Sequence, residues 1–169
     1  MKKFELTAEF VTNVFGKKLF RIKALVAFGN VEKGELGGFI EKEDNLSHGG
    51  DAWVSGNAQV FGNAQVSGNA QVSGDARVSG NAWVFGNADY AVVTGFGRYF
   101  RATTFFRCKD KILRIQCGCF YGDLAQFREI VKKTHGDSKY AKEYLAIADL
   151  MELHFSDECG GEQWENSLI

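Results

Sequence analysis

Residues 51–89 read DAWVSG-NAQVFG-NAQVSG-NAQVSG-DARVSG-NAWVFG-NAD, a six-residue unit, hereafter a hexad, repeated without interruption. Every full hexad has Ala at its second position and Val at its fourth, and its final Gly is followed by Asn or Asp. Strand residues two apart point to the same side, so Ala and Val are expected inside. Gly followed by Asn or Asp supplies the positive φ of a tight corner. This period predicts a β-helix, whose coils bury each other's apolar residues, rather than a sandwich, a barrel or a disordered tract.

The hexads resemble those of the hexapeptide-repeat, left-handed β-helix superfamily. Members of that superfamily close a three-sided coil with three hexads, about eighteen residues. The left-handed sense follows from the resemblance alone, because crossover connections are ordinarily right-handed. Six full hexads make only about two such coils, so flanking segments must extend or cap the stack. We therefore expect a mainly β protein built on a short left-handed hexapeptide-repeat β-helix.

The chain is predicted to divide into four segments. Residues 1–29 form an N-terminal β-hairpin, and residues 30–93 form the β-helix, beginning with an irregular coil. Residues 94–155 form a ββαα module that is too small to be stable alone and should pack on the solenoid or on another subunit. Residues 156–169 form a flexible acidic tail.

Local signals place the elements of the two flanking segments. Strands are expected at Phe4–Val11, Leu19–Phe28, Tyr99–Cys108 and Ile112–Cys117. Asp123 is a suitable N-cap, with Gln126 three residues later, for a helix that ends at His135 before Gly136. A second helix over Ser138–Phe155 would place one apolar stripe inward, formed by Tyr144, Ile147, Ala148 and Met151.

Two further stretches extend the resemblance over most of the chain. They are LFRIKALVAFGNVEKGELGGFIEKEDNLS at 19–47 and TTFFRCKDKILRIQCGCFYGDLAQFREIVKKTHGDSKYAKEYL at 103–145. With the hexads, they resemble a group of small phage-borne and prophage-borne hexapeptide-repeat proteins, described as polymer-forming or YdcK-like. The resemblance implies a virus-encoded accessory protein in the host cytoplasm and implies no particular chemistry.

Composition restricts the classes of partner. The chain of 169 residues has a net charge of −1, which gives no overall attraction to nucleic acid or to an anionic membrane. It has no apolar run long enough to span a membrane, and its N-terminus lacks a signal-peptide core. Four Cys without a disulfide-like spacing fit a reducing cytoplasm. We expect a cytoplasmic protein with no cofactor, no nucleic-acid partner and no membrane partner.

Aromatic residues in the hexads predict a contact surface. Because Val points inward, its neighbours along the strand point outward. The aromatic residues expected on the outside of the coils are therefore Trp53, Phe61, Trp83 and Phe85. Exposed Trp and Phe usually mark an interface. We favour association into a homo-oligomer, and the alternative is that the ββαα module folds back over these rings.

Basic residues on the predicted hairpin indicate a ligand site. On one face of the first strand we expect Arg101, Thr103, Phe105, Arg107 and Lys109, joined across the hairpin by Arg114. The loop Gly118–Gly122 leads to a helix N-terminus, whose free N–H groups favour anions. Cations, a hydroxyl and a ring from Phe105 or Tyr121 suit a phosphorylated ligand with a base. A solvated polar face is the simpler alternative.

Two other chemistries are weaker hypotheses. A hexapeptide acyltransferase would need a His near a subunit boundary, and we interpret the nearby candidate, His48, as a surface or corner residue. Metal ligation could involve Cys108, Cys117 and Cys119, but one C-x-C without a second close pair is a weak zinc signal. We interpret these thiols as small core residues and expect no metal site.

Two functions therefore lead. The first is a non-enzymatic phage protein whose oligomer binds and sequesters a nucleotide-derived immune signal of the host, an anti-defence sponge. The second is a structural or interaction solenoid that binds and blocks a host defence protein. A small-ligand affinity that depends on salt would favour the first, and a stable complex with a host macromolecule would favour the second.

Overall fold

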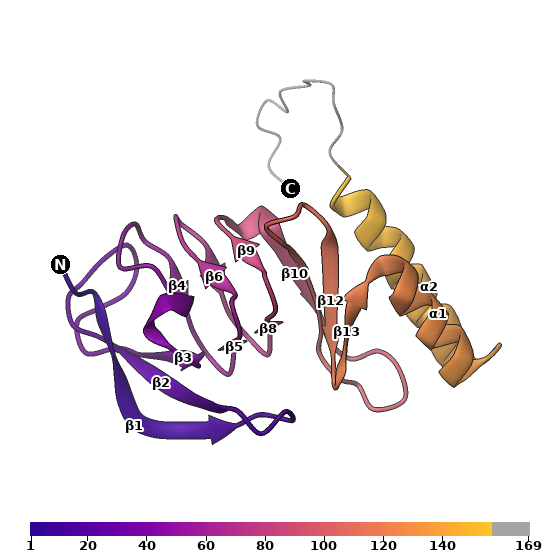
Figure 1. The fold of residues 1–169 in the computed structure, drawn as a ribbon, viewed down its shortest axis with the longest axis horizontal. Helices are drawn as coiled ribbons and strands as arrows, with labels where there is room; N and C mark the ends of the chain where they lie inside the picture. Colours follow the sequence, from indigo (N-terminus) through magenta and orange to yellow (C-terminus); the bar gives the residue numbers. More distant parts are fainter. Residues whose placement is uncertain (157–169) are drawn as a thin grey trace.

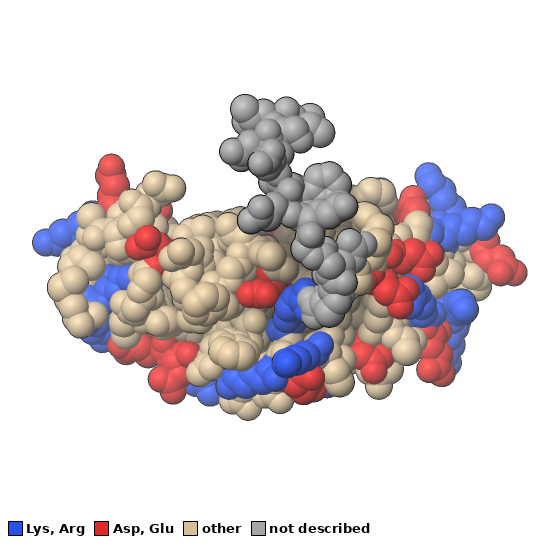
Figure 2. Space-filling view, turned by 90° about the horizontal axis from the view of Figure 1, so that it is seen from above, with Lys and Arg blue, Asp and Glu red and all other residues tan. Residues whose placement is uncertain are grey.

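The computed structural model describes residues 1–156, arranged along one long axis (Figure 1). A two-stranded hairpin lies at one end, a stack of short coils lies in the middle, and a sheet covered by two helices lies at the other end. The predicted flexible acidic tail falls, except for Ser156, outside the described residues. Seen from above, much of the surface over the coils is uncharged, whereas side chains of both signs cover the helical end (Figure 2).

The N-terminal hairpin forms as predicted, with a shorter second strand. Strand β1 (Phe4–Thr12) pairs antiparallel with β2 (Lys18–Ala24), and β2 pairs with β3 (Leu36–Ile40). The second strand was expected to continue to Phe28. It ends at Ala24 because the backbone N–H and C=O of Phe28 bond Val31 in a separate turn.

The hexads each form one two-residue strand and one corner. Their strands are β4 (Trp53–Val54), β5 (Gln59–Val60), β6 (Gln65–Val66), β7 (Gln71–Val72), β8 (Arg77–Val78) and β9 (Trp83–Val84). The pairs β4–β7, β5–β8 and β6–β9 are parallel, and each residue faces the residue eighteen positions later. Three hexads therefore close one three-sided coil. The preceding irregular coil contains β3, which pairs with β5, and the 3-10 helix η1 (Glu43–Asn45).

The inward assignment of the repeated residues is confirmed. The Ala and Val of all six full hexads are at most 1 % exposed. The Gly residues that close the first five hexads have φ between 62° and 69°, the left-handed conformation expected at a corner. The repeat ends at the 3-10 helix η2 (Asn87–Asp89), where Ala88 is exposed instead of buried.

The C-terminal module has four strands where two were expected. They are β10 (Tyr90–Val93), β11 (Thr103–Arg107), β12 (Leu113–Cys117) and β13 (Phe120–Asp123), paired antiparallel in that order. β10 lies in residues assigned to the solenoid, and β13 lies in residues assigned to a loop. The loop prediction was wrong because Gly118, with φ 57°, allows a tight turn that pairs Cys117 with Phe120.

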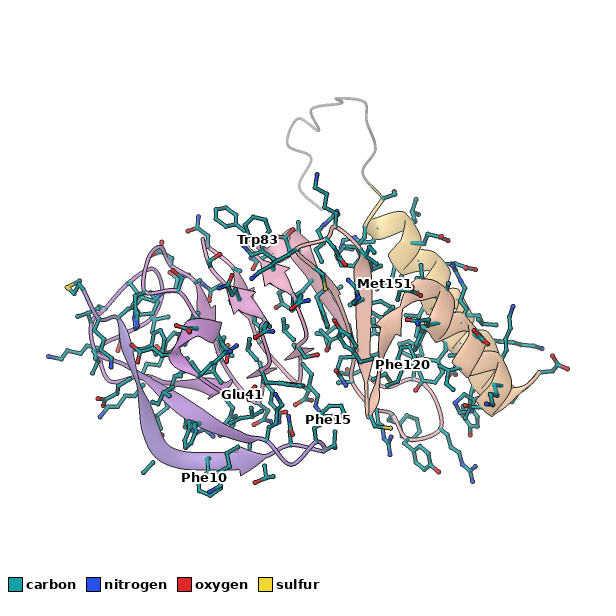
Figure 3. All side chains as sticks on the ribbon, in the orientation of Figure 1. Phe10, Phe15, Glu41, Trp83, Phe120 and Met151 are labelled. Carbon is teal, nitrogen blue, oxygen red and sulfur yellow. The ribbon has the colours of Figure 1, made fainter. Side chains whose placement is uncertain are left out.

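The two predicted helices are confirmed. Helix α1 (Leu124–His135) begins after Asp123, whose side chain accepts a hydrogen bond from the Gln126 N–H at 2.8 Å. Helix α2 (Lys139–His154) begins after Ser138, and its predicted apolar stripe is buried. Met151 and Phe120 point into the layer between the helices and the sheet (Figure 3). Within residues 1–156, no helix is long and apolar enough to cross a membrane.

Both ends of the coil core are covered by the same chain. Phe4 and Ile22 of the hairpin cover one end, and Phe106 and Cys108 of the module cover the other. Thr104 Oγ1 accepts a hydrogen bond from the backbone N–H of Arg77 at 2.9 Å, so the module also protects the edge of the last coil. The core of the coils is therefore covered at both ends by other segments of this chain.

Candidate functional site

Four of the nine residues predicted to bind a ligand line two separate hollows beside the junction of coils and module. The first, the aromatic–basic groove, has a volume of about 540 Å³ and is lined by Trp83, Phe85, Asp89, Arg107, Cys108, Lys109 and Lys111. The second, the waist cleft, has a volume of about 570 Å³ and is lined by Val14, Asn57, Gln59, Asp75, Arg77, Arg101, Ala102, Gly118 and Cys119. Figure 3 places Trp83 on the upper edge of the coils and Phe15, next to the cleft residue Val14, on the lower edge.

The last hexad supplies the aromatic wall of the groove. Trp83 and Phe85 lie on either side of the inward Val84 and are 53 % and 62 % exposed, so their predicted exposure is confirmed. Phe85 lies over the corner of the coil below, because a Cβ built on Gly68 would come within 3.0 Å of its ring. The groove thus has two outward rings on a rigid coil.

The end of β11 and the following turn supply the basic wall. Arg107 Nη2 donates to the carbonyl oxygen of Phe155 at 3.2 Å, and Arg107 Nε lies 3.6 Å from Asp89 Oδ1. The Lys109 N–H donates to the Asn81 carbonyl at 3.1 Å, which fixes the turn to the last coil. Within residues 1–156, the side chains of Lys109 and Lys111 form no ion pair, because the adjacent Asp110 pairs with Arg114.

The guanidinium of Arg114 is paired with the carboxylate of Asp110. Its two terminal nitrogens donate to the two oxygens of Asp110 at 2.8 and 2.7 Å. Hydrogen bonding to Arg114 lowers the pKa of Asp110 to about 2, and the same pairing raises the pKa of Arg114. Arg114 therefore holds the β11–β12 turn closed instead of facing a ligand as we predicted.

Two residues predicted on the basic face are buried. Thr103, Phe105 and Arg107 do share one face of β11, but α1 and α2 cover that face. The Phe105 ring packs edge-on against Phe127 at 6.1 Å, and Thr103 Oγ1 lies 3.2 Å from Cys117 Sγ. The predicted stacking of Phe105 on a base is wrong because the sheet has protein on both sides.

The predicted anion site at the helix start is also closed. Gly122 is buried in β13, and Asp123 and Gln126 cap the first turn of α1 reciprocally at 2.8 and 2.9 Å. Tyr121 stacks on Phe106 at 6.3 Å, and its hydroxyl lies against Gly80 of the last coil. Partial burial raises the pKa of Tyr121. Tyr121 therefore joins the module to the last coil.

The other two predicted interface aromatics are buried within the chain. Trp53 is 2 % exposed and packs edge-on against Phe28, at 5.4 Å between ring centroids. Phe61 is 6 % exposed and packs with Leu19 and Phe39. Both point out of their coils as expected, but the hairpin and the 25–35 loop cover them, so the prediction of surface exposure was wrong.

Arg101 and Gly118 are the predicted residues that reach the waist cleft. Arg101 precedes β11 instead of lying on it, because the predicted strand from Tyr99 starts only at Thr103. Its guanidinium stacks on Tyr99 at 5.0 Å. A Cβ built on Gly118 would lie 2.9 Å from Arg101 Nη1, so the glycine leaves room for that side chain.

His48 is paired with a carboxylate, which the sequence did not reveal. Its Nδ1 accepts from the backbone N–H of Lys3 at 3.1 Å, and its Nε2 lies 2.7 Å from Glu43 Oε1. The Nδ1 lone pair is therefore used, and Nε2 is the ring nitrogen that faces the carboxylate of Glu43. Stacking on Phe4 at 4.3 Å completes a structural contact of the first coil.

The three described cysteines do not converge. Cys108 packs in the coil core, Cys117 lies against the helix layer, and Cys119 is exposed. No group of three or more Cys, His, Asp or Glu within residues 1–156 is placed to hold a metal ion. The C-x-C spacing thus places two thiols on one tight turn, on different sides.

Several lining residues were not singled out from the sequence. Lys111 and Asp89 line the groove, and Arg77, Gln59 and Asn57 line the cleft. One signal was available, because Arg77 occupies the hexad position that elsewhere holds Gln or Trp. The remaining residues meet only through the pairing of coils eighteen residues apart and the docking of the module.

Comparison with known proteins identifies the repeat. Residues 70–86 match a family model described as the YdcK beta solenoid repeat. These residues contain β7, β8 and β9, the strands of the last complete coil. No curated protein matches the chain. The match supports a β-solenoid repeat and indicates no ligand.

Proposed function

We propose that this protein is a non-enzymatic, phage-encoded oligomer that binds and sequesters a nucleotide-derived immune signal in the host cytoplasm. In this proposal the coils form a left-handed hexapeptide-repeat β-helix, and the ligand lies in the aromatic–basic groove. The observation that carries the proposal is the exposed pair Trp83 and Phe85 beside the cations of Arg107, Lys109 and Lys111.

The groove supplies the two contacts that a nucleotide needs. A base stacked on Trp83 or Phe85 gains about 1–3 kcal/mol, and charge-assisted hydrogen bonds to phosphate contribute on the order of 1.5–3 kcal/mol each. The volume of about 540 Å³ is that of a small-molecule site, within the range of about 300–1,000 Å³. The open rings could also contact a second subunit, which would close the groove over the ligand.

The residues of the groove are better suited to binding a ligand than to catalysing a reaction. Burial raises the pKa of the Cys108 thiol, which keeps it protonated and weakly nucleophilic at neutral pH. Asp89 lies beside Arg107 and accepts from the backbone N–H groups of Phe85 and Gly86, both at 2.9 Å. Its carboxylate is therefore occupied in holding the last corner of the coil.

Calorimetry against cyclic dinucleotides and ADP-ribose derivatives tests the ligand. The double variant Trp83→Gln/Phe85→Ser converts the last hexad to NAQVSG, which the chain already uses twice, so the coil should remain intact. We expect binding by the parent and a loss of about tenfold or more in this variant and in Lys109→Gln/Lys111→Gln. Lys132→Gln/Lys133→Gln removes the same charge from exposed α1 positions and should bind normally. Absence of parental binding to every compound contradicts the proposal.

Light scattering tests the oligomer. The same Trp83→Gln/Phe85→Ser protein should form a smaller assembly with unchanged β content if these rings join subunits. An unaltered mass would show that these rings do not join subunits. Phe10→Ala removes an exposed ring from the distant hairpin and serves as the control.

A second candidate is a solenoid that binds and blocks a host defence protein. The exposure of Trp83 and Phe85 also favours this function, because such rings commonly anchor protein interfaces. A host macromolecule that co-purifies with the parent, survives removal of small molecules and is lost from the double variant would favour it. A small molecule released on denaturation and identified by mass spectrometry would favour sequestration.

A further inference from the structure

The waist cleft lies between all three parts of the molecule. Outward residues of two neighbouring coils form its floor, namely Asn57, Gln59, Asp75 and Arg77. Val14 of the hairpin loop forms one wall, and the module forms the other with Arg101, Ala102, Gly118 and Cys119. None of these residues lines the aromatic–basic groove, so the cleft is a separate hollow.

The register of the coils determines the chemistry of the floor. Gln59 faces Arg77 on the next coil, and Asn57 Nδ2 lies 3.5 Å from Asp75 Oδ1. Gln59 Oε1 is buried without a hydrogen-bond partner among residues 1–156. Arg77 is the only cation at the third position of any full hexad. Arg at this hexad position therefore places one guanidinium on a floor that otherwise holds the amides of Asn57 and Gln59 and the carboxylate of Asp75.

A second guanidinium faces the cleft from the module. Arg101 is held by stacking on Tyr99 and by the space left at Gly118. Within the described part of the chain, neither Arg77 nor Arg101 forms an ion pair with a carboxylate. Both guanidinium groups line one hollow, so an anion bound there would supply oxygen acceptors to both of them.

We propose that the waist cleft binds a small hydroxyl-bearing anion, either a sugar phosphate or a sugar acid. Guanidinium groups match the planar oxygen pairs of phosphate and carboxylate. Asn57, Gln59 and Asp75 supply donors and acceptors for hydroxyl groups, including the unpartnered oxygen of Gln59. The lining contains no aromatic ring, which distinguishes this ligand from the base-bearing ligand of the groove.

Calorimetry with glucose 6-phosphate and glucuronate tests the proposal, with glucose and inorganic phosphate as comparisons. We expect at least one anionic sugar to bind more tightly than both comparisons. Arg77→Gln, which gives the hexad DAQVSG, and Arg101→Gln should each weaken binding about tenfold or more. Arg98→Gln is the matched control, since Arg98 also stacks on Tyr99 but lies outside the cleft.

The pattern of binding decides between the two sources of negative charge. Preference for glucose 6-phosphate assigns a phosphate, preference for glucuronate assigns a carboxylate, and equal binding assigns an anion of either kind. The proposal is overturned if neither anionic sugar binds, if inorganic phosphate or glucose binds equally well, or if Arg98→Gln loses as much affinity as Arg101→Gln. Binding at the cleft and binding at the groove can fail separately, because their variants share no residue.

Discussion

The coils and the C-terminal sheet bury their strands in different ways. In each coil strand one residue points inward and its neighbour points outward, so the Val of every full hexad is buried while Gln65 and Gln71 are exposed. In β11 four consecutive residues, Thr103 to Phe106, are buried. One face of β11 covers the end of the coils, and the other lies beneath α1 and α2.

This difference explains which predictions failed. Alternation identifies the buried face of a strand only when the other face meets solvent. The hexads satisfy that condition where the coils are uncovered, whereas β11 does not, and Phe105 was therefore assigned to a ligand although it is core. The predicted exposure of Trp53 and Phe61 was wrong for the same reason, because the hairpin and its loop cover the outside of the first coils.

The largest expected effect is in the coil core. Val66→Asp buries an unpaired carboxylate and should destabilise the fold by at least about 4 kcal/mol, enough to abolish folding. Gln65→Asp changes the adjacent exposed residue and should shift stability by no more than about 0.5 kcal/mol. Thermal unfolding followed by circular dichroism measures both. Equal melting of Val66→Asp and the parent would overturn the inward assignment.

The next effect tests the two-sided burial of β11. Phe105→Ala should destabilise the protein by about 3–5 kcal/mol because it leaves a cavity against Phe127. Ile112→Ala removes an exposed side chain from the same hairpin and should change stability by about 0.5 kcal/mol or less. Chemical denaturation distinguishes them. Similar, small losses of stability in both variants would show that the Phe105 side chain is exposed instead of buried.

A smaller effect is expected where the module passes from sheet to helix. Asp123→Ala removes the N-cap acceptor of α1 and should destabilise the protein by about 1 kcal/mol. Asp137→Ala, one residue before the Ser138 cap of α2, should be nearly neutral. Denaturant midpoints at constant m-value measure the difference. No difference between the two variants would show that the Asp123 hydrogen bond does not contribute.

The smallest effect concerns the turn between β11 and β12. Because the pKa of Asp110 is lowered to about 2 from 3.8, its pairing with Arg114 stabilises the fold above the ordinary pKa. That stabilisation is lost as pH falls through about 2. Arg114→Gln should raise the pKa of Asp110 towards 3.8, as followed by NMR titration of its carboxyl carbon. Lys111→Gln should leave the pKa of Asp110 lowered. An equal rise of this pKa in both variants would show that Asp110 does not pair specifically with Arg114.

Local patterns predicted more of the architecture than of the candidate sites. Asp123 with Gln126 correctly predicted the start of α1. The buried face of α2 was predicted from the spacing of Tyr144, Ile147, Ala148 and Met151. These signals depend on neighbours a few positions away. In contrast, Arg107 with Trp83, and Arg77 with Arg101, line common hollows only because distant segments dock.

The sequence by itself determined the solenoid. A strict six-residue period leaves one way to bury every Ala and Val while turning at every Gly, so the fold of the coils follows from near-neighbour chemistry. The tertiary structure alone decided which outward residues stay exposed. Trp53 and Trp83 occupy the same hexad position, yet the first lies beneath the 25–35 loop and the second lines an open groove. Exposure of an outward residue depends on the segments that cover it, and the repeat contains no information about them.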